Sequence, residues 1–496
     1  MKKKEVLILI GLLILTCFLE AGLLTKTSIW HDEAFSVLLP QYSMTEMIYR
    51  AGLDVHPPFY YILLKGWFYL LGNSVFSLRL FSLVFGALSV IIFFYLIKMS
   101  FGDKKLSLFL SFLFLSNCFF IQYEIEGRMY TLALFLSLTS TLFLIKALKR
   151  KRKLDWFLYS LFVALGVYTH YYVLFLVFAQ GFFLAIYFLK KSGFSLKGLL
   201  SNRDLKDSVF SFLLIGILFL PWLKTFFAQL HQVSQGYWIP KMNIWSVPGT
   251  LWKLTTGRGI DINILSSKII LVLLSLLVLF FIFYFLKKTP FFEKYLFLSL
   301  FLLPFILSAL LSLKRSVYLD RYFIFVLPFF LTIGGTCLWQ LNNSWFRKLL
   351  IIFVLLASSI SFPLYWKKLE VYKKPGMKKA AEYLNQNVKN GQKIYVGSSF
   401  VFFTLRYYNK TPVLPKLFAP GPLSHFSGTA LLDKKDIVKD LNKGLKKGDI
   451  VYLVNTTGFG NYQPPVPQNW KKIEVKGFQD LYDYRGWIIV TKYQVQ

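Results

Sequence analysis

Five short clusters of acidic, basic, histidine and tyrosine side chains interrupt the long apolar runs of this chain. They read WHDEAFS at 30–36, DVHPPFYY at 54–61, QYEIEGRMY at 122–130, THYY at 169–172 and KRSVYLDRY at 314–322. The adjacent carboxylates Asp32 and Glu33 can accept a proton from an attacking hydroxyl group. The guanidinium of Arg128 can bind a phosphate through two N–H groups. These residue types therefore indicate chemistry between a hydroxyl nucleophile and a phosphate.

Each cluster also has a purely structural explanation. The carboxylate pair could be the acidic start of a helix in a solvated turn, and His56 could cap the helix that follows it. Glu126 could pair with Arg128, which is worth little at an exposed position. Aromatic belts at membrane surfaces explain the tyrosines around His170, but they explain His170 itself less well. The three basic residues of 314–322 indicate either an anion site or a misplaced helix boundary.

The composition places these clusters in a polytopic membrane protein. Hydrophobic residues make up 56% of the 496 residues, and the mean hydropathy is +0.53. Soluble chains contain roughly 45–50% apolar residues, so fibrous, disordered and ordinary soluble proteins are excluded. The net charge of +33 comes from short basic clusters between apolar runs. Membrane topology explains such clusters, and we expect no nucleic-acid partner. The three cysteines lie in apolar runs and are expected to be buried thiols.

Eleven apolar segments are expected to span a bilayer, because a spanning helix needs about 20 residues. They lie near 5–24, 78–97, 106–121, 130–146, 155–170, 171–189, 208–226, 265–286, 295–313, 322–341 and 349–366. The first is interpreted as a retained signal anchor. The shorter segment 57–72 carries Lys65 and is expected to lie at the outer interface. All basic clusters between the spans, apart from 314–322, then face one side. The N-terminus is therefore expected in the cytoplasm of a cell (inner or plasma) membrane protein.

The chain changes character near Trp366, and the remainder is polar. A helix is expected at 378–389, and strands are expected at 393–397, 449–455 and 486–493. The predicted fold is thus a mostly α polytopic membrane protein with outer juxtamembrane helices and a small C-terminal extracytoplasmic α/β domain. The predicted domains are 1–366, with a first outer loop at 25–77, and 367–496. The second holds 22 basic and nine acidic residues, which suits either anionic lipid head groups or a solvated lysine surface.

Taken in order, the motifs resemble the glycosyltransferase C superfamily, and most closely the bacterial form of its protein-mannosyltransferase-like branch (family 39). The resemblance rests on WHDEAFS, on DVHPPFYYILLKGWFYLLG at 54–72 and on the EGRMY turn. It is supported by THYY, by YWIP at 237–240, by RYFIFVLP at 321–328 and by PGMKKAAEYLNQNVKNGQKIYVG at 375–397.

The resemblance implies transfer of a sugar, a hexose or pentose, from a polyprenyl monophosphate to an acceptor hydroxyl on the extracytoplasmic face. Asp32 would be the catalytic base of one inverting displacement, and Glu33 would orient it or the acceptor. The expected donor phosphate and substrate site comprises His56, Glu126, Arg128, Tyr130, His170, Tyr171, Arg321 and Tyr322. The acceptor would be a lipid, a glycan or a protein, although the β-trefoil domain of the eukaryotic protein mannosyltransferases is absent from the sequence.

Several alternatives stay open at this stage. No cofactor is expected, although Asp32, Glu33 and His56 could together hold a divalent cation. The role of Glu124 is unsettled, because relatives often have a serine–glutamine pair before this glutamate. A lipid-linked glycan flippase or transporter is the main alternative function. It is less favoured because carboxylates are missing from the middle of the predicted spans. A scaffold would leave the outer polar clusters without a reason. The aromatic rings of Trp238, Trp245 and Trp252 suit either sugar stacking or interfacial anchoring.

Overall fold

The computed structural model describes residues 20–236, 238–257, 265–342, 344–368, 376–480 and 486–496, together with isolated positions between 7 and 17. The first expected span and Tyr237 of the YWIP motif therefore lie wholly or largely outside the described residues. The chain forms two compact units, and each is assembled from three segments. Unit 1 contains Met1–Ala21, His56–Tyr60 and Arg79–Tyr365, and unit 2 contains Gly22–Val55, Tyr61–Leu78 and Trp366–Gln496.

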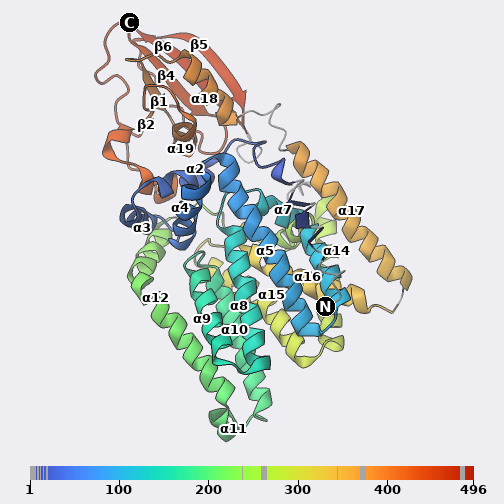
Figure 1. Ribbon diagram of the computed structural model, residues 1–496. Coiled ribbons are helices and arrows are strands. Elements are labelled where there is room, and N and C mark those ends of the chain that lie inside the picture. Colours follow the sequence, from blue (N-terminus) through green and yellow to red (C-terminus); the bar gives the residue numbers. More distant parts are fainter. Residues whose placement is uncertain are drawn as a thin grey trace. The chain divides into compact units, whose positions relative to one another are not determined.

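Unit 1 is a bundle of long apolar helices (Figure 1). Its elements are α5 (Val75–Phe101), α6 (Lys104–Leu115), α7 (Cys118–Glu124), α8 (Tyr130–Arg150), α9 (Lys153–Val167), α10 (Val173–Lys191), α11 (Leu196–Ser201), α12 (Arg203–Gln235), α13 (Ser246–Thr256), α14 (Leu265–Lys288), α15 (Phe291–Ser312), η2 (Asp320–Val326), α16 (Leu327–Gln340) and α17 (Ser344–Lys368). Helix α8 lies at the centre, with 83% of its most apolar stretch buried, whereas only 17% of the corresponding stretch of α12 is buried. The exposed apolar surface of α12 suits contact with lipid.

Among the described residues, seven helices are long and apolar enough to cross a membrane. They correspond to seven of the eleven expected spans, namely α5, α8, α10, α12, α14, α15 and the combined η2–α16. The span expected at 106–121 is a pair of helices, α6 and α7, bent by 64°. The span expected at 155–170 corresponds to α9, which has 15 residues. The last expected span falls in α17, some of whose side chains lie outside the described set. The prediction of a polytopic, mostly helical membrane protein is confirmed.

A single asparagine explains the bend between α6 and α7. Asn117 is the N-cap of α7, and its Oδ1 accepts hydrogen bonds from the backbone N–H groups of Phe119 and Phe120 at 3.0 and 3.1 Å. Its Nδ2 donates to the carbonyl of Leu254 in α13 at 2.8 Å. An N-cap with these bonds starts a new helix in a new direction, so the apolar run continues while the helix axis turns.

Unit 2 combines the first outer segment of the chain with its C-terminal part. Its helices and short turns are α2 (His31–Leu38), η1 (Leu39–Gln41), α3 (Met44–Leu53), α4 (Phe59–Leu71), which begins in unit 1, α18 (Gly376–Asn387), α19 (Ser399–Tyr408), η3 (His425–Ser427), η4 (Thr429–Leu431) and η5 (Lys434–Asp436). Most of the segment 25–77 thus belongs to the same compact unit as the C-terminal part. The sequence analysis assigned this segment to the membrane domain. The last segment of unit 2 begins at Trp366, and the domain boundary expected near this residue stays a prediction.

A six-stranded mixed sheet forms the core of the C-terminal part (Figure 1). The strands are β1 (Lys393–Val396), β2 (Lys416–Phe418), β3 (Ile437–Val438), β4 (Ile450–Thr456), β5 (Trp470–Gln479) and β6 (Trp487–Val495), in the order β3-β2-β1-β4-β6-β5. Strands β1 to β4 pair in parallel, and β6 and β5 add antiparallel strands. The expected helix and three strands are confirmed as α18, β1, β4 and β6. Strands β2, β3 and β5 and helix α19 were not predicted.

The segment expected at the outer interface forms the 13-residue helix α4, which is too short to span a bilayer. Its Lys65, which interrupts the apolar run, donates hydrogen bonds from Nζ to the carbonyls of Pro40 and Tyr42 at 2.7 and 2.6 Å. These carbonyls belong to the turn η1 and its C-cap, where a positive charge is favourable. Lys65 therefore joins α4 to the element that follows α2.

Candidate functional site

The predicted catalytic pair begins helix α2 in unit 2, and its two carboxylates differ in environment. Glu33 is buried, with 1% of its surface exposed, and its Oε2 accepts a hydrogen bond from the backbone N–H of Trp30 at 3.4 Å. Asp32 is only partly buried. Acidic residues in the first helical turn are stabilised by the helix dipole. Glu33 thus closes the start of the helix, while Asp32 remains accessible.

The C-terminal part of unit 2 holds the loop that carries this pair. The His31 ring packs against Phe400 and Phe403 of α19, at centroid distances of 5.0 and 5.7 Å. The backbone N–H of Ile29 donates a hydrogen bond to the hydroxyl of Tyr408 at 3.0 Å. The N–H of Lys378 donates to the Ser28 hydroxyl at 3.1 Å. The position of α2 within unit 2 therefore depends on residues more than 300 positions away in the sequence.

Replacing Tyr408 with phenylalanine is expected to loosen this attachment. The variant loses the hydrogen bond to Ile29, and one such bond contributes about 1 kcal/mol to stability. We expect a lower thermal unfolding midpoint and reduced activity at a given temperature, measured on the purified protein. Tyr462→Phe is the matched control, because no described residue forms a hydrogen bond with the Tyr462 hydroxyl and its ring already stacks on Phe418. Equal stability losses in both variants would rule out a specific role for Tyr408.

In unit 1, the turn between α7 and α8 buries Arg128. Only 2% of its surface is exposed, and its backbone N–H donates to the Glu126 carbonyl at 2.8 Å, forming a tight turn. The hydroxyl of Ser82 in α5 donates to the Arg128 carbonyl at 3.2 Å. The side-chain Nη2 lies 3.4 Å from Nε2 of His56. The segment carrying His56 is fixed in turn by a 3.0 Å hydrogen bond from the N–H of Phe59 to the carbonyl of Tyr168. Two predicted site residues from separate clusters are thus in contact.

His170 lies in the turn between α9 and α10, inside an aromatic cage. Its ring is 5.0 Å from the ring of Tyr322, 5.6 Å from that of Tyr172 and 6.1 Å from that of Tyr130. Its Nδ1 accepts a hydrogen bond from the backbone N–H of Tyr172 at 3.2 Å, which leaves Nε2 as the protonated nitrogen of the neutral ring. The cage orients this N–H group without giving the ring a charge.

Burial lowers the pKa of His170 to about 3, and the charges of His56 and Arg128 act in the same direction. The folded protein therefore keeps His170 neutral, whereas an unfolded chain would protonate it below about pH 6.5. Above about pH 6.5 the ring is neutral in both states and does not disfavour folding. As the pH falls from about 6.5 towards 3, only the unfolded chain takes up the proton, so the free energy of unfolding decreases. At pH 5 the loss is about 2 kcal/mol.

His170→Gln is expected to remove this pH dependence, because glutamine does not titrate. Between pH 7.5 and pH 5, the unfolding midpoint of the wild-type protein should fall further than that of the variant. Thermal unfolding of both proteins at both pH values measures the difference. A parallel fall in the two proteins would show that His170 is not the group that titrates.

Arg321 belongs to the same electrostatic neighbourhood. Together with Arg128 and Glu126, it interacts electrostatically with the Tyr130 hydroxyl. Its guanidinium carbon lies 5.5 Å from the ring centroid of Trp238, a cation–π contact. The preceding residue, Asp320, starts the turn η2 and is paired with Lys253 of α13 at 2.5 Å. A second arginine is therefore held near Tyr130 by elements far from it in the sequence.

Seven of the predicted residues thus lie in one neighbourhood of unit 1: His56, Glu126, Arg128, Tyr130, His170, Arg321 and Tyr322. Tyr171 has contacts with α12. Its hydroxyl accepts a hydrogen bond from Trp222 at 2.8 Å and donates one to Gln229, both in α12. Tyr172 lies in the neighbourhood of the seven residues, with its ring 4.7 Å from that of Tyr322. Asp32 and Glu33 lie in unit 2, and their participation in the same reaction centre stays a prediction.

The sequence missed Tyr172 and left Trp238 undecided. Both tyrosines of the THYY motif fit an aromatic belt, and nothing in the motif distinguishes their directions. Trp238 belongs to the YWIP motif, so its position beside Arg321 could have been suspected from the resemblance. No signal in a single sequence, however, pairs residue 238 with residue 321.

Glu124, whose role the sequence left unsettled, has a buried partner in Glu20. The two side chains are hydrogen-bonded, and each is at most 3% exposed. Two carboxyl groups in hydrogen-bond contact must share at least one proton. A Cβ atom at Gly86 in α5 would collide with the Glu124 carboxyl, so this position needs glycine. Glu124 therefore links the N-terminal segment to α5 and α7.

An apolar cavity of about 80 Å³ lies elsewhere in unit 1. Its walls come from α6, α13, α14, α15, α16 and α17, and they include Leu113, Leu274, Leu277, Val278, Phe281, Phe301, Phe330 and Leu338. Gly334 and Gly335 of α16 also line it, and a Cβ atom at Gly335 would collide with Leu110. Asn117 and Thr255 supply its few polar atoms. A cavity of this lining suits a hydrocarbon chain.

Within the described ranges, no group of three or more His, Cys, Asp or Glu side chains is arranged to hold a metal ion. The suggested combination of Asp32, Glu33 and His56 draws on both units. Independence of a divalent cation therefore stays a prediction.

Comparison with known proteins gives one family model and several solved structures to which the chain is similar. Residues 55–201 match the family model described as dolichyl-phosphate-mannose-protein mannosyltransferase. No curated protein sequence matches the chain significantly. Among solved structures, the chain is similar to ArnT from Cupriavidus metallidurans in the apo state, with 11% identity, a TM-score of 0.63 and 98% of each chain covered. It is equally similar to the same protein bound to undecaprenyl phosphate, with 13% identity, a TM-score of 0.62, and 99% of this chain and 98% of that chain covered.

The sequence match covers the segment that holds His56, Arg128 and His170, and the structural similarity extends over nearly the whole chain. Together they agree with the resemblance drawn from the motifs: the chain has the fold of the two ArnT structures, and its residues 55–201 match a mannosyltransferase family model.

Proposed function

We propose that the protein is a membrane glycosyltransferase that moves a hexose or pentose from a polyprenyl monophosphate to an acceptor hydroxyl. The observation that carries the proposal is the contact of the buried Arg128 with the half-buried His56, next to the neutral His170 and its tyrosine cage. The planar set of N–H groups of a buried arginine suits a phosphate ligand, which it can bind through two hydrogen bonds. Tyrosine and neutral histidine can bind sugar and phosphate oxygens as hydrogen-bond donors.

The proposed reaction is a single inverting displacement. Asp32 takes the proton of the acceptor hydroxyl while the acceptor oxygen forms a bond to the anomeric carbon. The bond from that carbon to the phosphate oxygen breaks, and its electron pair leaves with the polyprenyl phosphate. Arg128 and Arg321 stabilise the developing negative charge, which is where a fixed cation lowers a barrier most. Glu33, buried at the helix start, positions Asp32.

The donor would be bound in two parts. Its phosphate and sugar would occupy the polar neighbourhood of Arg128, while the polyprenyl chain would lie along apolar helix surfaces or in the cavity lined by α14 and α16. The structural relative bound to undecaprenyl phosphate supports a lipid phosphate ligand for this fold. The reaction needs no cofactor, and we expect a metal chelator to leave it unchanged because a monophosphate donor does not require a divalent cation.

The basic clusters support a proposed reaction on the extracytoplasmic face of the cell membrane. In this topology the N-terminus is cytoplasmic and the C-terminal part of unit 2 is extracytoplasmic. Tags accessible to a membrane-impermeant reagent at positions 151 and 443 would test this arrangement, since only the second should be labelled in intact cells.

Transfer assays in proteoliposomes would test the function itself. The protein would be offered a panel of radiolabelled polyprenyl-phosphate hexoses and pentoses, together with an envelope extract as the source of acceptors. We expect label to appear in a lipid, glycan or protein product without ATP or nucleotide sugar. Movement of the intact labelled lipid across the bilayer without transfer would instead support a flippase and contradict the proposal.

A further inference from the structure

A polar cavity in unit 2 is unexplained by the proposed donor site. It has a volume of about 220 Å³ and lies between the α2–α3 region and the C-terminal part of the same unit. Leu38 and Leu431 form its apolar walls, and five polar residues line the rest: Gln41, Tyr42, Arg406, Asp433 and Lys435. A cavity of this size accommodates several water molecules or one sugar ring.

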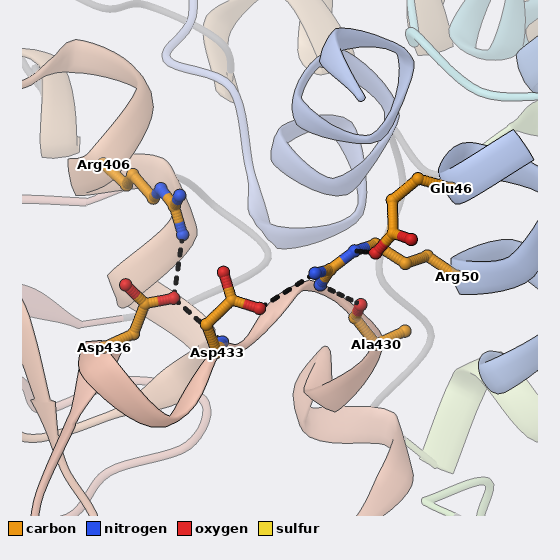
Figure 2. A network of polar contacts seen from close by, with 6 residues as sticks. All are labelled: Glu46, Arg50, Arg406, Ala430, Asp433 and Asp436. Carbon is orange, nitrogen blue, oxygen red and sulfur yellow. Dashed lines mark hydrogen bonds and ion pairs between the residues drawn. The ribbon is translucent and has the colours of Figure 1, made fainter. Parts of the chain in front are cut away.

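An ion-pair network fixes one wall of the cavity (Figure 2). Arg50 of α3 donates to Glu46 at 2.6 Å, to Asp433 at 2.8 Å and to the carbonyl of Ala430 at 3.0 Å. Its guanidinium also lies over the Tyr42 ring, 4.3 Å from the centroid. With three anchored hydrogen bonds and 13% exposure of its side chain, Arg50 is a rigid support. It holds one carboxylate and one aromatic ring of the cavity in place.

A second pair fixes the opposite side. Arg406 of α19 donates to Asp436 at 3.1 Å, and the same carboxylate oxygen accepts the backbone N–H of Asp433 at 3.0 Å (Figure 2). The hydrogen bond from Arg50 lowers the pKa of Asp433, so this carboxylate is ionised at neutral pH. Only one of the two Asp433 oxygens is engaged in the network that Figure 2 draws. The network therefore preorganises hydrogen-bonding groups around the cavity.

The cavity carries an excess of positive charge. Lys435 is exposed, and no described residue forms a hydrogen bond or ion pair with its ammonium group. Arg406 also lines the cavity and is paired with Asp436, and Asp433, the single carboxylate of the lining, is paired with Arg50. The positive charge that is left over is therefore that of Lys435. The surrounding C-terminal segment is itself strongly basic, with 22 basic and nine acidic residues from Trp366 onward. Long-range attraction therefore favours an anion at this position.

We propose that this cavity binds an anionic saccharide, a single sugar ring that bears a carboxylate or phosphate group. Lys435 and Arg406 would pair with the acidic group. The carboxylate of Asp433 and the amide of Gln41 would bind sugar hydroxyls, which need both acceptors and donors. The Tyr42 ring would contact the apolar face of the sugar.

The place of this cavity in the molecule suggests that the saccharide belongs to the acceptor. It is lined by residues that directly follow α2, the helix carrying Asp32, and a ligand held there would share unit 2 with the proposed base. This identification as the acceptor rests on the proposed transfer reaction, whereas the binding of an anionic saccharide does not.

Direct binding to the full-length protein tests the proposal without any donor. The probes are glucuronic acid and glucose 6-phosphate, with glucose as the neutral counterpart, added to the detergent-purified protein and followed by saturation-transfer NMR. We expect the two anionic sugars to bind and to compete with each other, and we expect glucose to bind about 10-fold more weakly. Binding should weaken with added salt. Equal binding of glucose and glucuronic acid would overturn the proposal.

Two adjacent lysines provide a matched pair of variants. Lys435→Gln should weaken binding of the anionic sugars about 10-fold, because one charged hydrogen bond is lost. Lys434→Gln removes the same charge from a neighbouring exposed position that does not line the cavity, and it should bind as the wild-type protein does. Both side chains are exposed, so neither change should lower the unfolding midpoint. Equal weakening in both variants would show that only the general surface charge matters, and it would overturn the proposed binding site.

Binding measurements with the same protein can also distinguish a saccharide carried by a lipid from a soluble one. Nanodiscs containing glucuronosyl diacylglycerol present the acidic sugar on a lipid, and discs containing glucosyl diacylglycerol or phosphatidylglycerol separate the sugar from the charge. Preference for the acidic glycolipid over both control lipids indicates a glycolipid head group. Preference for the free acidic sugar indicates a soluble glycan, and both results support the cavity. Saccharide binding in a protein that transfers no sugar would leave the cavity intact and refute only the proposed function.

Discussion

Asp32→Asn is expected to lower sugar transfer by about 1,000-fold, since positioned general bases contribute 10²- to 10⁴-fold. Asparagine keeps the size and polarity of the side chain but cannot accept the acceptor proton. Asp32 is only partly buried, and the change should leave the unfolding midpoint almost unaltered. Initial rates in proteoliposomes at saturating donor would measure the loss. Near-native turnover in this variant would remove Asp32 from the role of base.

Glu33→Gln is the matched comparison, because it changes the adjacent carboxylate in the same way. Glu33 is buried and accepts a hydrogen bond at the start of α2, so its replacement should lower stability as well as activity. A large loss of activity without a loss of stability in Asp32→Asn, and both losses in Glu33→Gln, would separate chemistry from positioning. The reverse pattern would exchange the two roles.

Arg128→Lys is expected to cost about 100-fold in turnover, the typical effect of removing one preorganised charged donor from a leaving group. Lysine keeps the charge but has no planar fork of N–H groups with which to bind a phosphate. Arg128 also contacts His56, so the geometry of the site changes with it. The variant should bind free polyprenyl phosphate more weakly, measured as product inhibition of transfer.

A neutral polyprenol serves as the control ligand for this measurement. It shares the hydrocarbon chain but has no phosphate, so its inhibition should be the same in the wild-type protein and in Arg128→Lys. If both ligands lose affinity equally, Arg128 supports the fold of the site and does not bind the phosphate. If neither ligand loses affinity and turnover is unchanged, the proposed donor site is wrong.

The sequence predicted the elements that have a strong local signal. Long apolar runs gave the spanning helices, and short β-branched runs gave β1, β4 and β6. Strand β5 escaped because its sequence WKKIEVKGFQ is largely exposed, as befits an edge strand protected by lysines. The bend at Asn117 escaped because a polar cap inside an apolar run is hard to distinguish from a tolerated polar residue.

The candidate site was predictable residue by residue but not as an assembly. The motifs identified His56, Arg128, His170 and Arg321, and the structure brings these into one neighbourhood. Whether Tyr171 or Tyr172 packs beside His170 depends on the direction in which each side chain points from the turn. The THYY motif carries no information about that direction. Contacts such as His31 with Phe400 join segments that are far apart, and one sequence carries no signal for such pairs.

The composite nature of unit 2 has a consequence for biogenesis. Its first segments, Gly22–Val55 and Tyr61–Leu78, emerge from the ribosome near the beginning of synthesis, whereas Trp366–Gln496 emerges last. At about 5–20 residues per second, the early segments wait on the order of half a minute for the strands and helices that complete their hydrophobic contacts. A nascent or prematurely terminated chain thus presents α2 without its supports. Unit 2 can therefore fold completely only after translation has finished. Until then, the apolar surface of its first segments is available to chaperones and proteases.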